Sequence, residues 1–128
     1  MNSKAEFDPK TYAIIGAAME VHRLLGCGLA EPVYQESLEI ELRERAIPFK
    51  AQEKLYLRYK GRLLKAYYVP DFLCFDSVIV ELKAIEQIGS IEAAQVINYL
   101  KVTGFQVGLV LNFKPQSLET RRFVWTKE

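Results

Sequence analysis

Two short charged motifs flank the most strongly β-forming stretch of this chain. Pro70-Asp71 precedes the stretch, and Glu81-Leu82-Lys83 ends it, with Glu81 ten residues after Asp71. Residues 72–80 are nearly all apolar apart from Asp76-Ser77, which predicts two adjacent, buried strands joined by a turn. Burying charged groups is costly unless they pair or bind a metal. The fold must therefore bring these charges to a place where partners or an ion offset that cost.

The turn between the two strands decides whether the two acids share a face of the sheet. Glu81 and Lys83 lie two residues apart on one strand, so they project from the same face. A two-residue loop would pair Asp71 with Leu82 and place Glu81 on the opposite face. A three-residue loop, Phe75–Ser77, pairs Asp71 directly with Glu81, with Cβ atoms ~4.5–5.5 Å apart. A site that uses both acids therefore requires an odd loop or a bulge.

In that register, two carboxylates face one point where a hard cation fits. Mg²⁺ prefers oxygen ligands and keeps several waters, and it would activate a bound water and stabilise charge on a phosphoryl group. Lys83 would orient the attacking water or neutralise developing charge, and the Leu82 carbonyl could supply a further ligand. A structural Glu81–Lys83 ion pair is the simpler alternative, but it does not explain why Asp71 should join them.

Length and composition indicate one soluble domain. The 128 residues suffice to bury a core as a single domain, residues 1–128. No apolar run approaches the ~20 residues of a membrane helix, and the polar first residues do not resemble a signal peptide. We therefore expect a cytoplasmic protein with no membrane association. Cys27 and Cys74 lack metal-binding spacing and predict free thiols.

Other catalytic classes are disfavoured by what the sequence lacks. No G-x-x-x-x-G-K-[ST] loop is present, which argues against an ATP-hydrolysing module. His22 is the only histidine, which excludes mechanisms that need two, and we expect it to be a partly exposed packing residue. Several aromatic residues are expected on core or sheet faces rather than as base-stacking platforms: Tyr67, Tyr68, Phe72, Phe75 and Trp125.

Charge is unevenly distributed, although the net charge is only +1. Between Lys50 and Lys65 there are six bases and one acid, Glu53, whereas between Glu36 and Arg45 there are four acids and two bases. A basic hairpin beside an acidic helix could present a one-sided surface to phosphates. Alternatively, the lysines protect exposed strand edges from aggregation. The sequence leaves both interpretations open.

Periodicity and capping residues predict the order of elements. Asp8-Pro9 starts a first helix that Gly26 or Gly28 ends, and a second helix should run from Pro32 to about Ala46. The remaining predicted elements are strands 55–59, 63–69, 71–75 and 78–83, a helix over 90–102, and strands 105–113 and 122–125. Strands 71–75 and 78–83 are expected to extend the sheet that strands 55–59 and 63–69 begin. This order predicts one α/β (α+β) domain with a mixed β-sheet flanked by helices.

Three motifs, in this order, resemble those of a known superfamily. Pro70-Asp71 followed by Glu81-Leu82-Lys83 is similar to the PD-(D/E)XK nuclease signature. Residues 28–34, GLAEPVY, resemble the G-x-x-E-x-x-Y motif that names one small branch of that superfamily. Residues 95–99, QVINY, resemble the Q-x-x-x-Y helix motif of its exonuclease-like branches. The resemblance extends from about Tyr12 to Phe113 and implies a restriction-endonuclease-like core.

The resemblance implies a metal-dependent nuclease that hydrolyses nucleic acid, DNA in preference to RNA, with Mg²⁺ as cofactor and Mn²⁺ as a substitute. Asp71 and Glu81 would be metal ligands, and Lys83 would be the catalytic lysine. Glu31 would be an extra acid that contacts the metal directly or through water. The small size of the chain is also compatible with a homodimer, or with a larger partner protein that supplies targeting.

The helical motif residues have roles implied by the resemblance and structural alternatives. Glu31 could simply cap a helix start, where a carboxylate is favoured. The resemblance implies that Gln95 positions the lysine or the substrate and that Tyr99 touches the phosphate backbone, whereas both could be a polar pair on a buried helix. We expect Tyr34 in the core, and Gly28 to meet a backbone requirement.

The alternative function is a catalytically silent nucleic-acid-binding or protein-interaction module with the same fold. A retired enzyme should have lost a carboxylate or the lysine, whereas this chain retains the complete set: Glu31, Asp71, Glu81, Lys83 and Gln95. An ordinary structural α/β domain, whose acids cap helices and pair with bases, is a further alternative.

Overall fold

A computed structural model describes residues 8–127, so the polar first residues, on which the signal-peptide expectation rests, lie outside the described residues. The helices in this range are α2 (Pro9–Leu25), α3 (Glu31–Glu44) and α4 (Ser90–Thr103). None of them combines the length and apolar character needed to cross a membrane. The strands are β1 (Phe49–Ala51), β2 (Leu55–Tyr59), β3 (Arg62–Tyr68), β4 (Phe72–Cys74), β5 (Val78–Lys83), β6 (Val107–Asn112) and β7 (Glu119–Val124).

The helix ends follow the capping residues. Asp8 caps α2, its side chain accepting a hydrogen bond of 3.0 Å from the Lys10 backbone N–H, and Gly26 follows the last residue of the helix. Gly104 ends α4 in a left-handed conformation with φ of 85°, a geometry that glycine adopts at low cost. The first two predicted helices are confirmed, with α3 starting one residue earlier than expected.

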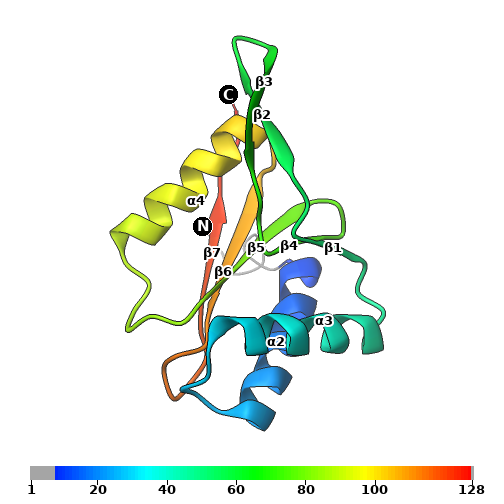
Figure 1. Cartoon of the computed structure of the whole chain (residues 1–128), viewed down its shortest axis with the longest axis vertical. Helices are drawn as coiled ribbons and strands as arrows, with labels where there is room; N and C mark the ends of the chain where they lie inside the picture. Colours follow the sequence, from blue (N-terminus) through cyan, green and yellow to red (C-terminus); the bar gives the residue numbers. More distant parts are fainter. Residues whose placement is uncertain (1–7, 128) are drawn as a thin grey trace.

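Five strands form one mixed sheet in the order β1-β4-β5-β6-β7 (Figure 1). Strands β5 and β6 are parallel, and the other neighbours are antiparallel. Parallel strands need a long crossover connection, and α4 supplies it between β5 and β6. Gly108 on β6 allows α4 to approach closely, because a Cβ there would lie only 2.6 Å from Val96 Cγ1.

Helices cover both faces of the sheet. On one face, α2 and α3 bury residues such as Ile14, Ala18 and Leu38 against Val78 and Val80 of β5. On the other face, α4 packs Val96 and Leu100 against a cluster that includes Ile79, Val110 and Phe123. The central strand β5 is therefore buried on both sides, which explains its apolar sequence.

The turn between β4 and β5 has three residues, as a site shared by Asp71 and Glu81 requires. Cys74 pairs with Val78, and Phe72 pairs with Val80. Phe75 and Asp76 in the turn adopt left-handed conformations with φ of 57° and 53°. One step beyond the last ladder pair, Asp71 lies opposite Glu81.

Strands β2 and β3 and their turn, residues 55–68, form a separate two-stranded sheet that we call the arm. The predicted hairpin turn is confirmed, with positive φ at both Lys60 and Gly61, as a type I′ turn requires. The expectation that these strands continue into the main sheet was wrong. Gln52 turns the chain out with φ of 57°, Pro70 offers no N–H to a ladder, and β1 pairs with β4 instead.

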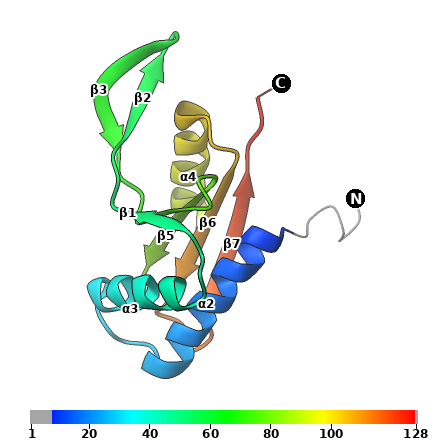
Figure 2. The same ribbon diagram turned by 90° about the vertical axis from the view of Figure 1, so that its right-hand side faces the viewer.

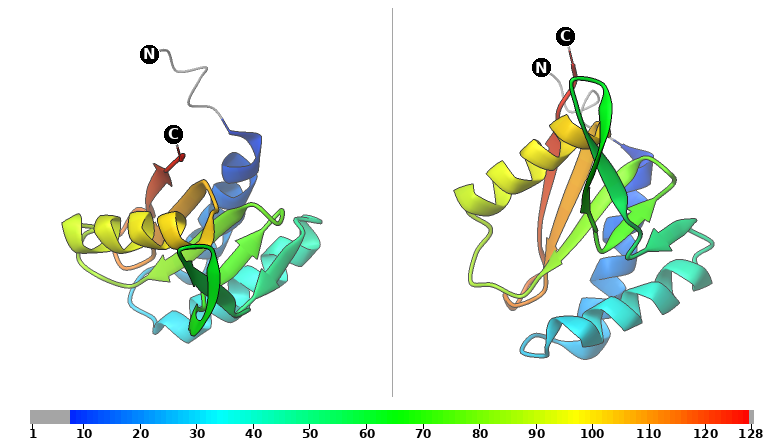
Figure 3. Two further views of the ribbon diagram at one scale, coloured as in Figure 1. Left: turned by 90° about the horizontal axis from the view of Figure 1, so that it is seen from above. Right: turned by 45° about the horizontal axis from the view of Figure 1, so that its top comes forward.

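The arm projects from the body at the end opposite to α2 and α3 (Figures 1 and 2). It rises beside the C-terminal end of α4 (Figure 3). At its foot, Leu55, Leu57 and Tyr68 pack into the α4 cluster. A two-stranded hairpin is marginally stable alone, so this apolar foot holds the arm in place.

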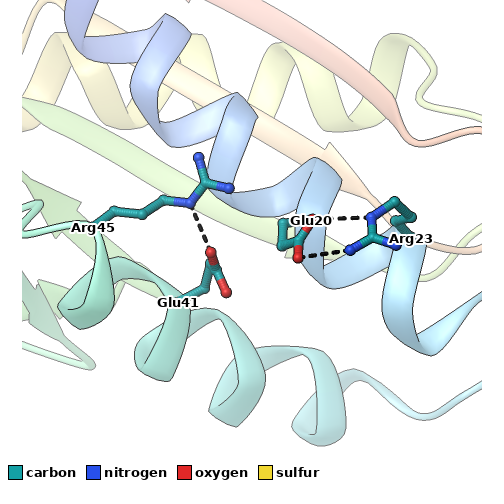
Figure 4. A network of polar contacts seen from close by, with 4 residues as sticks. All are labelled: Glu20, Arg23, Glu41 and Arg45. Carbon is teal, nitrogen blue, oxygen red and sulfur yellow. Dashed lines mark hydrogen bonds and ion pairs between the residues drawn. The ribbon is translucent and has the colours of Figure 1, made fainter.

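Ion pairs lie on the surfaces of α2 and α3 (Figure 4). Glu20 pairs with Arg23 at 2.9 Å within α2, and Glu41 pairs with Arg45 at 2.7 Å. The bases of α3 therefore partly neutralise its acids. Because α3 and the arm lie at opposite ends of the molecule, the basic hairpin does not lie beside the acidic helix.

Predictions for isolated side chains had mixed outcomes. Cys27 and Cys74 are free thiols, as predicted, and burial raises the pKa of Cys74 to about 12. His22 is buried rather than partly exposed, and its Nε2 lies 2.9 Å from the Pro115 carbonyl oxygen. Tyr34 is fully buried, as expected, whereas Tyr67 lies on the exposed arm.

Candidate active site

The alternation of β5 places Glu81 and Lys83 on the α4 face of the sheet. Val80 and Leu82 point into the core under α2 and α3, so the residues on either side of Leu82 point the other way. Glu81 and Lys83 are half-buried at the end of an otherwise buried strand. Lys83 exerts a favourable charge interaction on Glu81, but within the described residues no ion pair joins them. The structural ion-pair alternative is therefore not observed.

Asp71 is held in place by two backbone N–H groups and by the side chain of Gln35. Its Oδ2 accepts a hydrogen bond of 2.7 Å from the Leu82 N–H. Its own carbonyl accepts bonds from the Gln52 N–H at 3.2 Å and from Gln35 Nε2 at 3.4 Å. These contacts fix the carboxylate against the strand that carries Glu81.

The carboxyl groups of Asp71 and Glu81 are in contact, and the pKa of Glu81 is strongly raised. Burial, the charge of Asp71 and the hydrogen bond between the two carboxyl groups raise the pKa of Glu81 to about 8, against a lowering effect of Tyr68 and Lys83. The Tyr68 hydroxyl donates a short hydrogen bond to Glu81 Oε2. Burial and the neighbouring acids raise the pKa of the Tyr68 hydroxyl above its ordinary value, so Tyr68 acts as a neutral donor.

Glu31 lies on the other side of Asp71, in a cleft of about 330 Å³. Its lining residues are Glu31, Pro32, Gln35, Gln52, Asp71 and Leu82. Glu31 is exposed and is the first residue of α3, where no side-chain cap is formed. The cap interpretation thus lacks its hydrogen bond, and Asp71 is the residue that borders both Glu31 and Glu81.

The segment before Glu31 is anchored to the core by Tyr34. The Tyr34 hydroxyl donates a 2.6 Å hydrogen bond to the Gly26 carbonyl and accepts one of 3.3 Å from the Leu29 N–H. The Tyr34 ring stacks on Phe113 with centroids 4.5 Å apart. Gly28 adopts φ of 97°, the backbone requirement expected for it. The spacing of Gly28, Glu31 and Tyr34 therefore has a structural explanation: it builds a fixed connection that presents Glu31 to the cleft.

The two α4 residues of the Q-x-x-x-Y motif occupy different surroundings. The Tyr99 ring stacks on Tyr68 at 3.7 Å between centroids and 8° between planes. Tyr99 thus touches the site through the residue that binds Glu81. Gln95 is exposed on α4, and within the described residues no hydrogen bond links it to Glu81 or Lys83. Its proposed role in positioning remains a prediction.

The donor set suits a hard cation but does not form a closed site. Within residues 8–127, no three side chains of His, Cys, Asp or Glu converge closely enough to hold an ion. Two carboxyl groups do converge, and their mutual repulsion is what a divalent cation would relieve. The oxygens of Asp71 and Glu81 and the carbonyl of Leu82 are the available ligands, and Glu31 lines the cleft beside Asp71. The residues present therefore fit an oxygen-liganded divalent metal.

Sequence reasoning missed three residues of this site: Tyr68, Gln35 and Gln52. Tyr68 was expected only as a sheet or core aromatic, yet it hydrogen-bonds Glu81. Its partner lies thirteen residues along the chain and on another sheet, so no local pattern reveals the contact. Both glutamines hydrogen-bond Asp71, and nothing in their spacing marks them.

Comparisons with known proteins agree with this geometry. The family model of the PD-(D/E)XK nuclease superfamily matches residues 8–123. The solved structure "Crystal structure of SSO0001" superposes with a TM-score of 0.58 at 15% sequence identity, covering 77% of this chain and 51% of that one. The chain therefore spans about half the length of that protein, and the likeness concerns the fold alone. No curated protein matches the chain. The mixed sheet flanked by helices and this likeness confirm the predicted restriction-endonuclease-like fold class.

Proposed function

Because the chain belongs to the PD-(D/E)XK nuclease superfamily, we propose that it is a nuclease that depends on a divalent metal, Mg²⁺ or Mn²⁺, and favours DNA over RNA. The supporting observation is the register that sets Asp71 opposite Glu81 at the end of the central strands, where burial, together with the charge of Asp71, raises the pKa of Glu81 to about 8. Holding two carboxyl groups together in a partly buried place costs folding free energy, and a bound divalent cation would offset that cost. We further propose membership of the G-x-x-E-x-x-Y branch, on the arrangement of Gly28, Glu31 and Tyr34.

The proposed division of labour follows from the geometry. Asp71, Glu81 and the Leu82 carbonyl would hold the ion, and Glu31 would contribute through water. When bound, the ion supplies a lowered pKa for a coordinated water and stabilisation of charge on the phosphate. The Leu82 N–H orients Asp71, and Tyr68 holds one oxygen of Glu81, so the two carboxylates keep their direction when the proton on Glu81 is lost.

Lys83 is the proposed catalytic lysine. Its side chain leaves β5 on the same face as Glu81, and it is half-buried without an ion-pair partner in the described chain. An ammonium in this position is free to contact a phosphate oxygen or an attacking water. Its backbone is fixed, because the Lys83 carbonyl accepts a 2.9 Å hydrogen bond from the Phe113 N–H.

The test is cleavage of labelled single- and double-stranded DNA and RNA with Mg²⁺ or Mn²⁺. Wild type is compared with Lys83→Ala and with the control Lys10→Ala. The control removes the same charge at a distant place, because Lys10 Nζ lies 3.3 Å from the Oγ of Ser77, at the other end of β5. We expect metal-dependent cleavage that Lys83→Ala abolishes and Lys10→Ala retains. Absence of cleavage by all three proteins, with metal binding confirmed, would instead support the catalytically silent binding module.

A further inference from the structure

The arm is a basic surface without acids. Residues 55–68 contain no Asp or Glu, and together with Lys54, which directly precedes them, they provide five bases: Lys54, Arg58, Lys60, Arg62 and Lys65. Within the described part of the chain, none of the five forms an ion pair, whereas Lys50, just before the arm, pairs with Asp76 at 3.3 Å. An unneutralised run of positive charge on a projecting element attracts a polyanion.

The arm also exposes aromatic rings among these cations. Tyr56, Tyr59 and Tyr67 are 48%, 62% and 47% exposed. The Lys54 ammonium lies 4.6 Å from the Tyr67 ring centroid, and the Lys60 ammonium lies 5.5 Å from that of Tyr59. These rings are not core residues, because only the foot of the arm packs against α4. Aromatic rings beside cations are the features that hold the bases and phosphates of an unpaired strand.

A second basic region adjoins the arm and widens this surface. A cleft of about 400 Å³ separates the arm from the end of α4 and the segment after β7, and its lining includes Arg58, Lys101, Trp125 and Lys127 but no acid. The positive surface therefore continues from the arm onto the body of the molecule beside α4.

The foot of the arm is connected directly to the candidate active site. Tyr68 is the last residue of β3, and its hydroxyl donates to Glu81. Asp71 follows three residues later in the chain. A strand bound along the arm would thus be led toward the two carboxylates.

We propose that the arm binds single-stranded nucleic acid, with bases against Tyr56, Tyr59 and Tyr67 and phosphates on the surrounding cations. This inference rests on the proposed function, since it names the substrate form that the same site receives. A duplex covers the faces of its bases, so only an unpaired strand can use the exposed rings. Two arms of equal positive charge repel each other, so a second copy of the chain would not pair its arm with this one.

The test measures binding without cleavage. The full chain is titrated, in EDTA, into short labelled DNA as a single strand or as a duplex of the same length, and anisotropy is recorded. We expect the single strand to bind more tightly, and Tyr59→Ala or Tyr56→Ala to weaken that binding roughly five- to a hundredfold. Tyr59→Phe, which keeps the ring, should bind as wild type does. Tyr12→Ala on α2 is the control for loss of an exposed tyrosine.

Charge variants give an independent measurement. Lys65→Gln should flatten the dependence of log affinity on log salt concentration by about 0.7 for single strands, and melting curves establish that each variant is folded. Equal affinity for single strand and duplex, or tyrosine variants that bind as wild type does, would overturn the proposal. Arm binding that persists in a protein without nuclease activity supports the arm assignment while refuting the proposed function. Cleavage that is unchanged by all arm substitutions would refute the proposed role of the arm but not the proposed nuclease function.

Discussion

Replacing Glu81 by Gln should stabilise the metal-free protein at alkaline pH, although it removes a proposed metal ligand. Burial, together with Asp71, raises the pKa of Glu81 from 4.5 to about 8. In the unfolded chain the carboxyl group ionises near its ordinary pKa, whereas in the folded chain it keeps its proton until about pH 8. The free energy of unfolding therefore falls as the pH rises between these two values, and the full cost is present above the higher one.

The magnitude follows from the same two values. A pKa raised from 4.5 to about 8 corresponds to a loss of roughly 4–5 kcal/mol at full ionisation, at about 1.4 kcal/mol per pKa unit. Gln keeps an oxygen that accepts the Tyr68 hydrogen bond and carries no charge. We therefore expect Glu81→Gln to exceed wild type by at least about 2 kcal/mol near pH 9 and to match it near pH 5.

The assay is denaturant unfolding of both proteins in EDTA across this pH range. Glu36→Gln, which removes an exposed acid from α3, is the control and should shift stability by less than about 0.5 kcal/mol at every pH. The assigned environment of Glu81 is refuted if the difference between Glu81→Gln and wild type does not depend on pH.

Three further predictions test the rest of the site and its scaffold. Mg²⁺ should raise the melting temperature more at about pH 8.5 than at pH 6, because at the lower pH the ion must displace the proton on Glu81. Asp71→Asn should abolish this increase. If the variant keeps the increase, Asp71 is not a metal ligand. Tyr34→Phe should lower the free energy of unfolding in urea by about 1–3 kcal/mol. It should also lower the cleavage rate under conditions where the variant is fully folded, since residues 26–31 would no longer be anchored to the core. Unchanged cleavage would contradict the role of this segment in presenting Glu31. Gly108→Ala should cost about 1–3 kcal/mol, since the new Cβ would lie 2.6 Å from Val96 Cγ1, and adding Val96→Ala should restore part of it; a neutral Gly108→Ala would mean that α4 yields.

Much of the fold could be predicted because its signals are local. Asp8 begins α2 and Gly104 ends α4 through contacts with their own neighbours, and apolar spacing identifies the buried strands. Whether Asp71 and Glu81 share a face depends on the length of the loop between β4 and β5, so the sequence left two alternatives, a two-residue loop and a three-residue loop. The three-residue turn found in the structure selects the one that brings the acids together.

Long-range contacts could not be predicted in the same way. A period of two shows that a segment is a strand but not which strand it joins, so the arm was wrongly assigned to the main sheet. The hydrogen bond from Tyr68 to Glu81 and the stacking of Tyr68 on Tyr99 each join separate elements. Neither contact leaves a mark in local composition. Asp71, in contrast, could be singled out because a charged group beside buried apolar strands is conspicuous, and Glu31 because residues 28–34 resemble a known motif.

The turn between β4 and β5 limits how this chain can change in length. Surface connections usually tolerate insertions and deletions. Here the loss or gain of a single residue in Phe75–Ser77 would reverse the side of the sheet to which Asp71 points relative to Glu81. Length changes in steps of two would preserve their alignment, so an evolving chain of this kind could vary the turn by pairs of residues but not by one. The arm ends in an exposed turn at Lys60-Gly61 and carries no such restriction, so changes in length there should destabilise the fold least.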